Sequence, residues 1–152
     1  MANTQAMCSS FLGELMTATH NFTTSTGNTF KAALYLASAT VNASTTAYSS
    51  TGEVTGTNYT AGGVTITNGT SPLSTNTSTT AGTGYWTPSA SITYTNVTLS
   101  TAFDAVLIYN STNSNKAVSV HTFGSQTVTA GTFTLTMPSN TTSTALLRLA
   151  TT

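Results

Sequence analysis

The sequence predicts an all-β protein of one domain, a β-sandwich resembling a jelly roll, with a short N-terminal helix or arm. Its 152 residues suffice for one domain with a core, and 38% of them are hydrophobic. Only 4% are charged, and threonine and serine replace the missing charges. Threonine is β-branched and favours strands, where its hydroxyl can face water. About eight to ten short strand-like segments, with turns about every eight to twelve residues, complete the pattern.

Residues 1–20 differ from the rest and predict a helical arm. The large apolar residues are spaced three to four apart, as on one side of a helix. They are Met7, Phe11, Leu12, Leu15 and Met16. A helix this short is marginal in isolation and must bury its apolar stripe. We expect the stripe to pack either on the chain's own sandwich or on a neighbouring subunit.

Residues 28–152 predict the β-sandwich domain. Alternating apolar residues, glycines and polar turns divide its first half into elements. The expected elements are a strand near 29–37, a short strand around 53–55, a strand over 64–67 opened by Gly62 and Gly63, and a long exposed loop over 68–84 with room for one edge strand.

The second half carries the most apolar segment of the chain, residues 105–109. Because both of its faces are apolar, it predicts a central strand covered on both sides. The other expected elements are one or two strands over 92–99, a polar loop over 110–115, a hairpin partner over 116–123, strands over 126–129 and 132–137 around a tight turn or bulge at Ala130 and Gly131, and a last strand over 145–149.

No catalytic group is expected. Acid–base catalysis needs paired carboxylates or a histidine beside a nucleophile. The carboxylates Glu14, Glu53 and Asp104 fall in three different kinds of segment. Glu53 and Asp104 could meet in space, but Asp104 is expected to cap the turn before the central strand. We therefore predict that the protein is not an enzyme.

No metal or cofactor site is expected either. His20, His121 and Cys8 lack the close spacing that zinc ligands normally show. We expect His121 on the polar face of a strand, His20 in a turn after the helix, and Cys8 packed as a small apolar residue beside Phe11.

The charge content restricts the partners that the protein can have. Three basic and three acidic residues sum to zero, so we expect neither nucleic acid nor an anionic membrane as a partner. No stretch predicts a transmembrane helix or a signal peptide, and the single cysteine cannot form an intrachain disulfide, which fits folding in a cytoplasm.

For Tyr85 and Trp86, packing in the core or an interface is favoured over a sugar-stacking platform.

Several segments resemble small structural proteins of tailed bacteriophages. They are MANTQAMCSSF (1–11), TFKAALYLASAT (29–40), TTAYSSTGEVTGTNYTAGGVTITN (45–68), TAFDAVLIYN (101–110) and NKAVSVHTFGSQTVTAGTFTLTMP (115–138), about half of the chain. The resemblance is spread over the sequence and contains no chemical motif.

This resemblance implies a virion protein, assembled in the bacterial host cytoplasm, and favours a capsid cement (decoration) protein. Such a protein would bind the major capsid protein and copies of itself, commonly as a homodimer or homotrimer. The contact residues would be Met7, Phe11, Leu12, Leu15, Met16, Tyr85 and Trp86. A tail-fibre or receptor-binding component and a carbohydrate-binding module remain as alternatives.

Overall fold

The computed structural model describes residues 2–75 and 82–151. In this part of the chain one helix, α1 (Ser9–Met16), accompanies the strands β1 (Ala6–Met7), β2 (Phe30–Leu36), β3 (Val64–Thr65), β4 (Leu73–Ser74), β5 (Thr83–Trp86), β6 (Ile92–Asn110), β7 (Lys116–Leu135) and β8 (Leu147–Ala150). They form an antiparallel five-stranded sheet, β1-β7-β6-β2-β3, and an antiparallel three-stranded sheet, β4-β5-β8. The predicted class, an all-β sandwich-like domain with a short helix, is confirmed.

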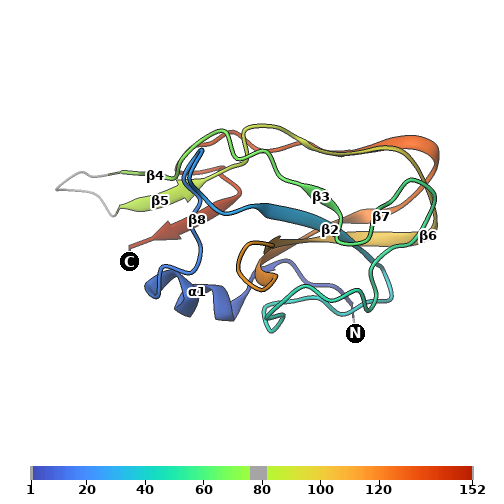
Figure 1. The fold of residues 1–152 in the computed structure, drawn as a ribbon, viewed down its shortest axis with the longest axis horizontal. Helices are drawn as coiled ribbons and strands as arrows, with labels where there is room; N and C mark the ends of the chain where they lie inside the picture. Colours follow the sequence, from blue (N-terminus) through green and yellow to red (C-terminus); the bar gives the residue numbers. More distant parts are fainter. Residues whose placement is uncertain (1, 76–81, 152) are drawn as a thin grey trace.

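The two longest strands, β6 and β7, form one hairpin that folds back on itself (Figure 1). Residues 105–110 of β6 pair directly with β2. Tyr94, near the start of β6, also reaches β2, because its hydroxyl donates to the Ala32 carbonyl at 2.8 Å. The ring of Phe133, near the end of β7, packs edge-on against Phe103 from the middle of β6, with centroids 5.0 Å apart. Both halves of the hairpin therefore enclose one core.

The expectation of uniformly short strands is wrong for this hairpin. Segments predicted as separate strands belong to β6, which has 19 residues, and β7, which has 20. The pairing register shifts repeatedly between Tyr94 and Phe103. Ala130, in the opposite strand, has a φ of 45°, so a bulge rather than a tight turn lies at Ala130–Gly131. Bulges break the alternation of side chains and bend a strand pair without ending it.

The central segment of β6 is buried on both faces, as predicted. The folded-back half of the hairpin covers one face, and the chain between β2 and β3 covers the other. There the ring of Tyr48 stacks on Tyr109 with centroids 4.7 Å apart. Gly63, just before β3, has a φ of 70°, and a Cβ at this position would lie 1.7 Å from the Ala32 carbonyl oxygen. Glycine therefore permits the close approach of β3 to β2.

The N-terminal segment is packed on the domain. β1 pairs with β7, and the amide of Cys8 donates to the Val118 carbonyl at 3.0 Å. Cys8 then serves as the extended N-cap residue of α1. Phe11 turns inward from α1, and its ring meets His20 and Phe22 with centroids 4.9 and 6.0 Å apart. The expected arm over residues 1–20 is thus tied to the sheet.

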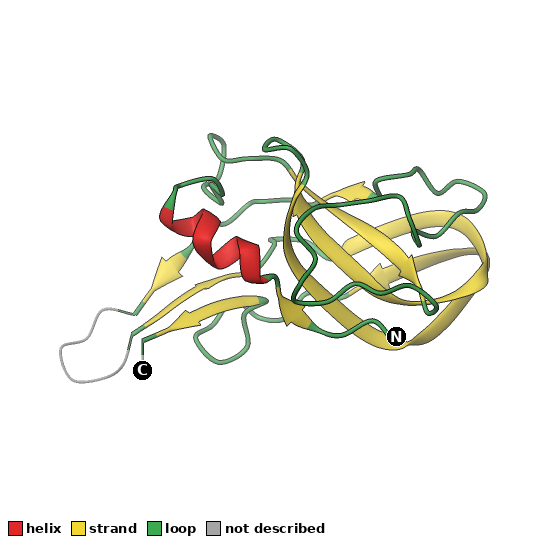
Figure 2. Ribbon diagram, turned by 90° about the horizontal axis from the view of Figure 1, so that it is seen from below, coloured by secondary structure: helices red, strands yellow, loops and turns green. Residues whose placement is uncertain are grey.

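The small sheet extends from one end of the sandwich, beside α1 (Figure 2). Trp86, the last residue of β5, anchors this sheet to the core. Its ring packs on Phe22 at 4.7 Å between centroids, and its Nε1 donates to Asn68 Oδ1 and the Thr70 carbonyl, both at 3.0 Å. The loop expected over 68–84 contains the edge strand β4, while its residues 76–81 lie outside the described part.

Candidate interaction surface

The outer side of α1 exposes large apolar side chains. Leu12 is 48% exposed and Met16 is 86% exposed, whereas Phe11 is 2% exposed. Because Leu12 and Met16 are one turn apart, they form a single apolar strip on the helix surface. The stripe predicted from the sequence is therefore divided between the protein's own core and solvent.

An apolar groove of about 140 Å³ lies between α1 and the small sheet. Its lining is hydrophobic from both sides and comprises Phe11, Leu15, Phe22, Pro72, Leu73, Gly84, Tyr85, Trp86, Leu147 and Leu149. Leu73 on β4 and Leu149 on β8 are 52% and 43% exposed at its rim. Leu15 lines the groove one turn from Leu12, so the groove and the helix strip are adjacent. We call the surface of Leu12, Leu15, Met16, Leu73 and Leu149 the apolar face.

The seven residues expected to make contacts fall into three groups. Leu12 and Met16 are exposed, and Met7, Leu15 and Tyr85 are partly buried. Phe11 and Trp86 are each 2% exposed within the core, so the expectation of a partner contact is corrected for these two. The sequence analysis missed Leu73 and Leu149. Two features of the sequence could have indicated these residues: Leu73 is an isolated leucine in a polar loop, and Leu149 alternates with Leu147.

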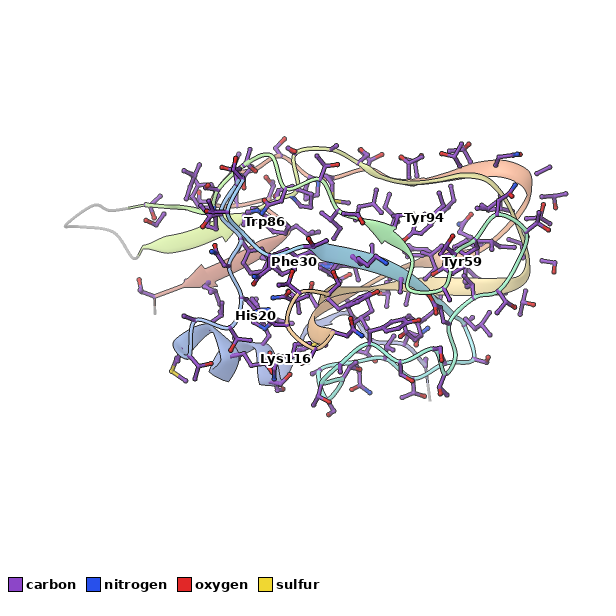
Figure 3. All side chains as sticks on the ribbon, viewed as in Figure 1. His20, Phe30, Tyr59, Trp86, Tyr94 and Lys116 are labelled. Carbon is purple, nitrogen blue, oxygen red and sulfur yellow. The ribbon has the colours of Figure 1, made fainter. Side chains whose placement is uncertain are left out.

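A hydrogen-bonded cluster fixes the inner side of α1. Glu14 accepts a bond from Lys116 Nζ at 2.6 Å through Oε1 and contacts His20 Nε2 at 2.7 Å through Oε2. His20 Nδ1 lies 3.2 Å from Asn110 Nδ2. Figure 3 shows His20 and Lys116 together beside the helix. Burial alone would raise the pKa of Glu14, but the bonds from Lys116 and His20 outweigh it and lower the pKa. The cluster therefore ties α1 to the start of β7 and to the end of β6.

Glu53 is a buried carboxylate, 5% exposed, in the chain that crosses the edge of β2. It accepts hydrogen bonds from Tyr48 Oη at 2.6 Å, Tyr59 Oη at 2.8 Å and the Gly62 amide at 2.8 Å. Tyr59 Oη in turn accepts the Leu34 amide at 3.0 Å. Burial, followed by the bond to Glu53, raises the pKa of Tyr48. These hydrogen bonds tie the segment between β2 and β3 to β2, and they supply the buried carboxylate of Glu53 with three donors.

His121 lies on an apolar face, which corrects the expectation of a polar one. It is paired with Val106 across the β6–β7 ladder and lines a cavity of about 210 Å³ together with Ile92 and Leu135. Its Nε2 lies 2.9 Å from Ser119 Oγ, and burial lowers its pKa to about 4. His20 does follow the helix, as expected, but it is buried at 7% exposure.

Asp104 does not cap a turn, because β6 continues through it, and its Oδ1 accepts a bond from Asn3 Nδ2 at 2.6 Å. Glu53, Asp104 and His121 share no hydrogen-bond partner among the described residues. In the same part of the chain, no three residues among histidines, cysteines and carboxylates are arranged to hold a metal ion. No helix in residues 2–75 and 82–151 has the length and hydropathy to cross a membrane.

Cys8 is fully buried, and burial, with a smaller effect of Glu14, raises its pKa to about 11. Its Sγ lies 3.9 Å from the Asn42 carbonyl. A buried thiol with a raised pKa is a poor nucleophile. This agrees with the packing role expected from the sequence.

No protein-family model, curated protein or solved structure matches the chain.

Proposed function

We propose that the protein is a structural component of a tailed-phage virion, a decoration protein that binds the capsid surface through its apolar face. The observation that carries this proposal is the exposure of Leu12 and Met16 on a helix that the hydrogen bond between Glu14 and Lys116 ties to β7. Large apolar side chains gathered at one place on the surface mark sites of protein association. The segments that resemble phage structural proteins support the same role.

The proposed mechanism of attachment is burial of apolar area on the major capsid protein. Burying one leucine or methionine side chain completely contributes about 1.5–3 kcal/mol before ordering costs are subtracted. The three basic and three acidic residues leave little long-range electrostatic attraction. Many identical sites on a shell would make a weak single contact sufficient.

Quantifying the chain in purified particles tests the proposal. Hundreds of copies per particle, retained in about 1 M NaCl, are expected, because salt screens charges and leaves apolar contacts in place. A handful of copies would instead support a tail component. Complete release by salt would contradict the apolar mechanism, and absence of the chain from the particles would contradict the virion role.

A further inference from the structure

We infer that two copies of this chain associate through the outer edge of β8, so that their small sheets join into one continuous antiparallel sheet. Within the described residues β8 pairs with β5 on one side, and no strand occupies its other side. Arg148, Leu149 and Ala150 are all exposed. An unpaired strand edge is a template for another strand, and an antiparallel strand can pair with its own copy about a two-fold axis.

The hydrogen bonds of the small sheet show which backbone groups point outward. The Thr151 amide donates to the Gly82 carbonyl at 2.9 Å, and Leu149 pairs with Gly84 two residues further on. Because backbone groups alternate in direction along an antiparallel strand, Leu149 directs its amide and carbonyl toward β5. Arg148 and Ala150 therefore direct theirs toward the open edge.

Among the registers that these directions allow, the one centred on Leu149 lets both outward residues form hydrogen bonds within the exposed stretch 148–150. Arg148 of one copy lies opposite Ala150 of the other and exchanges two hydrogen bonds with it, and the symmetry repeats this pair, which gives four bonds in all. Leu149 then lies opposite Leu149 of the second copy as a non-hydrogen-bonded pair, in which side chains approach most closely. The register also separates the two Arg148 side chains, so no like charges face each other.

Two features of the edge favour a second copy as the occupant. β8 carries no proline and no bulge, two of the devices that protect an edge strand, and its one charged side chain, Arg148, donates to the Thr142 carbonyl at 3.4 Å within the same chain. Its exposed apolar side chain, Leu149, becomes buried against itself. The interface is small, so we expect a dimer that dissociates in the micromolar range or weaker. The inference assigns Leu149 of the apolar face to the contact between copies; it concerns the purified protein and does not depend on the proposed attachment of Leu12 and Met16 to a capsid.

Cysteine crosslinking tests the register. A non-hydrogen-bonded antiparallel pair places its Cα atoms about 4.5 Å apart, which a disulfide can span. With glutathione disulfide as oxidant, Leu149→Cys should give a covalent dimer. Ala150→Cys is the matched control one residue along the same edge. In this register Ala150 lies opposite Arg148 of the second copy, so the Cα atoms of the two residues at position 150 are about 8 Å apart, beyond the reach of a disulfide. Cys8 is buried and is common to both variants.

Light scattering on purified protein tests the association itself. From about 10 to 300 µM the mass should rise from 15.6 kDa toward twice that value. Leu149→Lys should stay monomeric, because it places like charges directly opposite each other. Leu73→Lys, the same change on the other edge strand, should associate like the wild type. A monomeric wild type, or crosslinking of Ala150→Cys as fast as of Leu149→Cys, would overturn the inference.

Discussion

Replacing Glu53 should be among the most destabilising single changes in the protein. Glu53→Ala removes the acceptor of three hydrogen bonds. The donors left without this acceptor are the hydroxyls of Tyr48 and Tyr59, at 2.6 and 2.8 Å, and the Gly62 amide, at 2.8 Å. Bonds to a charged group each contribute about 1.5–3 kcal/mol net. Part of this is offset, because the variant no longer buries a charge. After this offset is subtracted from the contribution of the three bonds, we expect a net loss of about 3–5 kcal/mol in the free energy of unfolding.

Urea unfolding measures this loss. Trp86, the only tryptophan, is 2% exposed, so its fluorescence reports the unfolding of the core. Glu53→Gln retains one acceptor oxygen and should lose about 1–2 kcal/mol, as should Tyr48→Phe, which removes one donor. The double variant should lose less than the sum of the two, because both changes remove the same bond. A Glu53→Ala protein within about 0.5 kcal/mol of the wild type would refute the role of this network.

Three further outcomes follow from the titratable groups. Burial lowers the pKa of His121 to about 4, so on acidification the unfolded chain binds a proton at this histidine before the folded chain does. The free energy of unfolding should therefore fall as the pH drops from about 6.5 to 4. His121→Gln should remove this pH dependence from the urea midpoints. Because the pKa of Glu14 is lowered, its ionised form stabilises the fold at pH values above the ordinary pKa of a glutamate, and this stability is lost as the pH falls further. Glu14→Gln should abolish this loss, and an unchanged loss of stability at acidic pH in the variant would argue against the cluster. Cys8 should resist iodoacetamide at pH 8 in the native protein and react in urea; rapid native labelling would contradict its burial.

Local patterns were sufficient to predict several elements. The alternation of Phe30, Ala32 and Leu34 predicts β2, and the run over 105–109 predicts a strand covered on both faces. Both predictions depend on side-chain periodicity, which the sequence carries directly. Gly131 indicated the position of the bulge, although the positive φ falls on its neighbour Ala130 and not on the glycine.

Long-range contacts were not predictable from such patterns. A bulge interrupts alternation just as a strand end does, so the continuity of β6 through Asp104 could not be recognised. Phe11 and Leu12 are adjacent and both apolar, and which of them faces the core depends on Phe22 beyond the helix and on Trp86, which is far away in the sequence. The structure therefore divides the residues of the expected interaction site between the core and the surface, and no local pattern in the sequence shows this division.

The contact proposed for Leu12 and Met16 can be measured directly with shells assembled from the major capsid protein. Replacing both residues by serine should weaken binding by about 30- to 1000-fold, which corresponds to about 2–4 kcal/mol of lost apolar burial. Urea unfolding should be nearly unchanged, because both side chains are exposed, and Gln126→Ser, an exposed residue at the bend of the hairpin, should bind like the wild type. Wild-type affinity in the doubly substituted protein would contradict the claim that this apolar face is the contact surface.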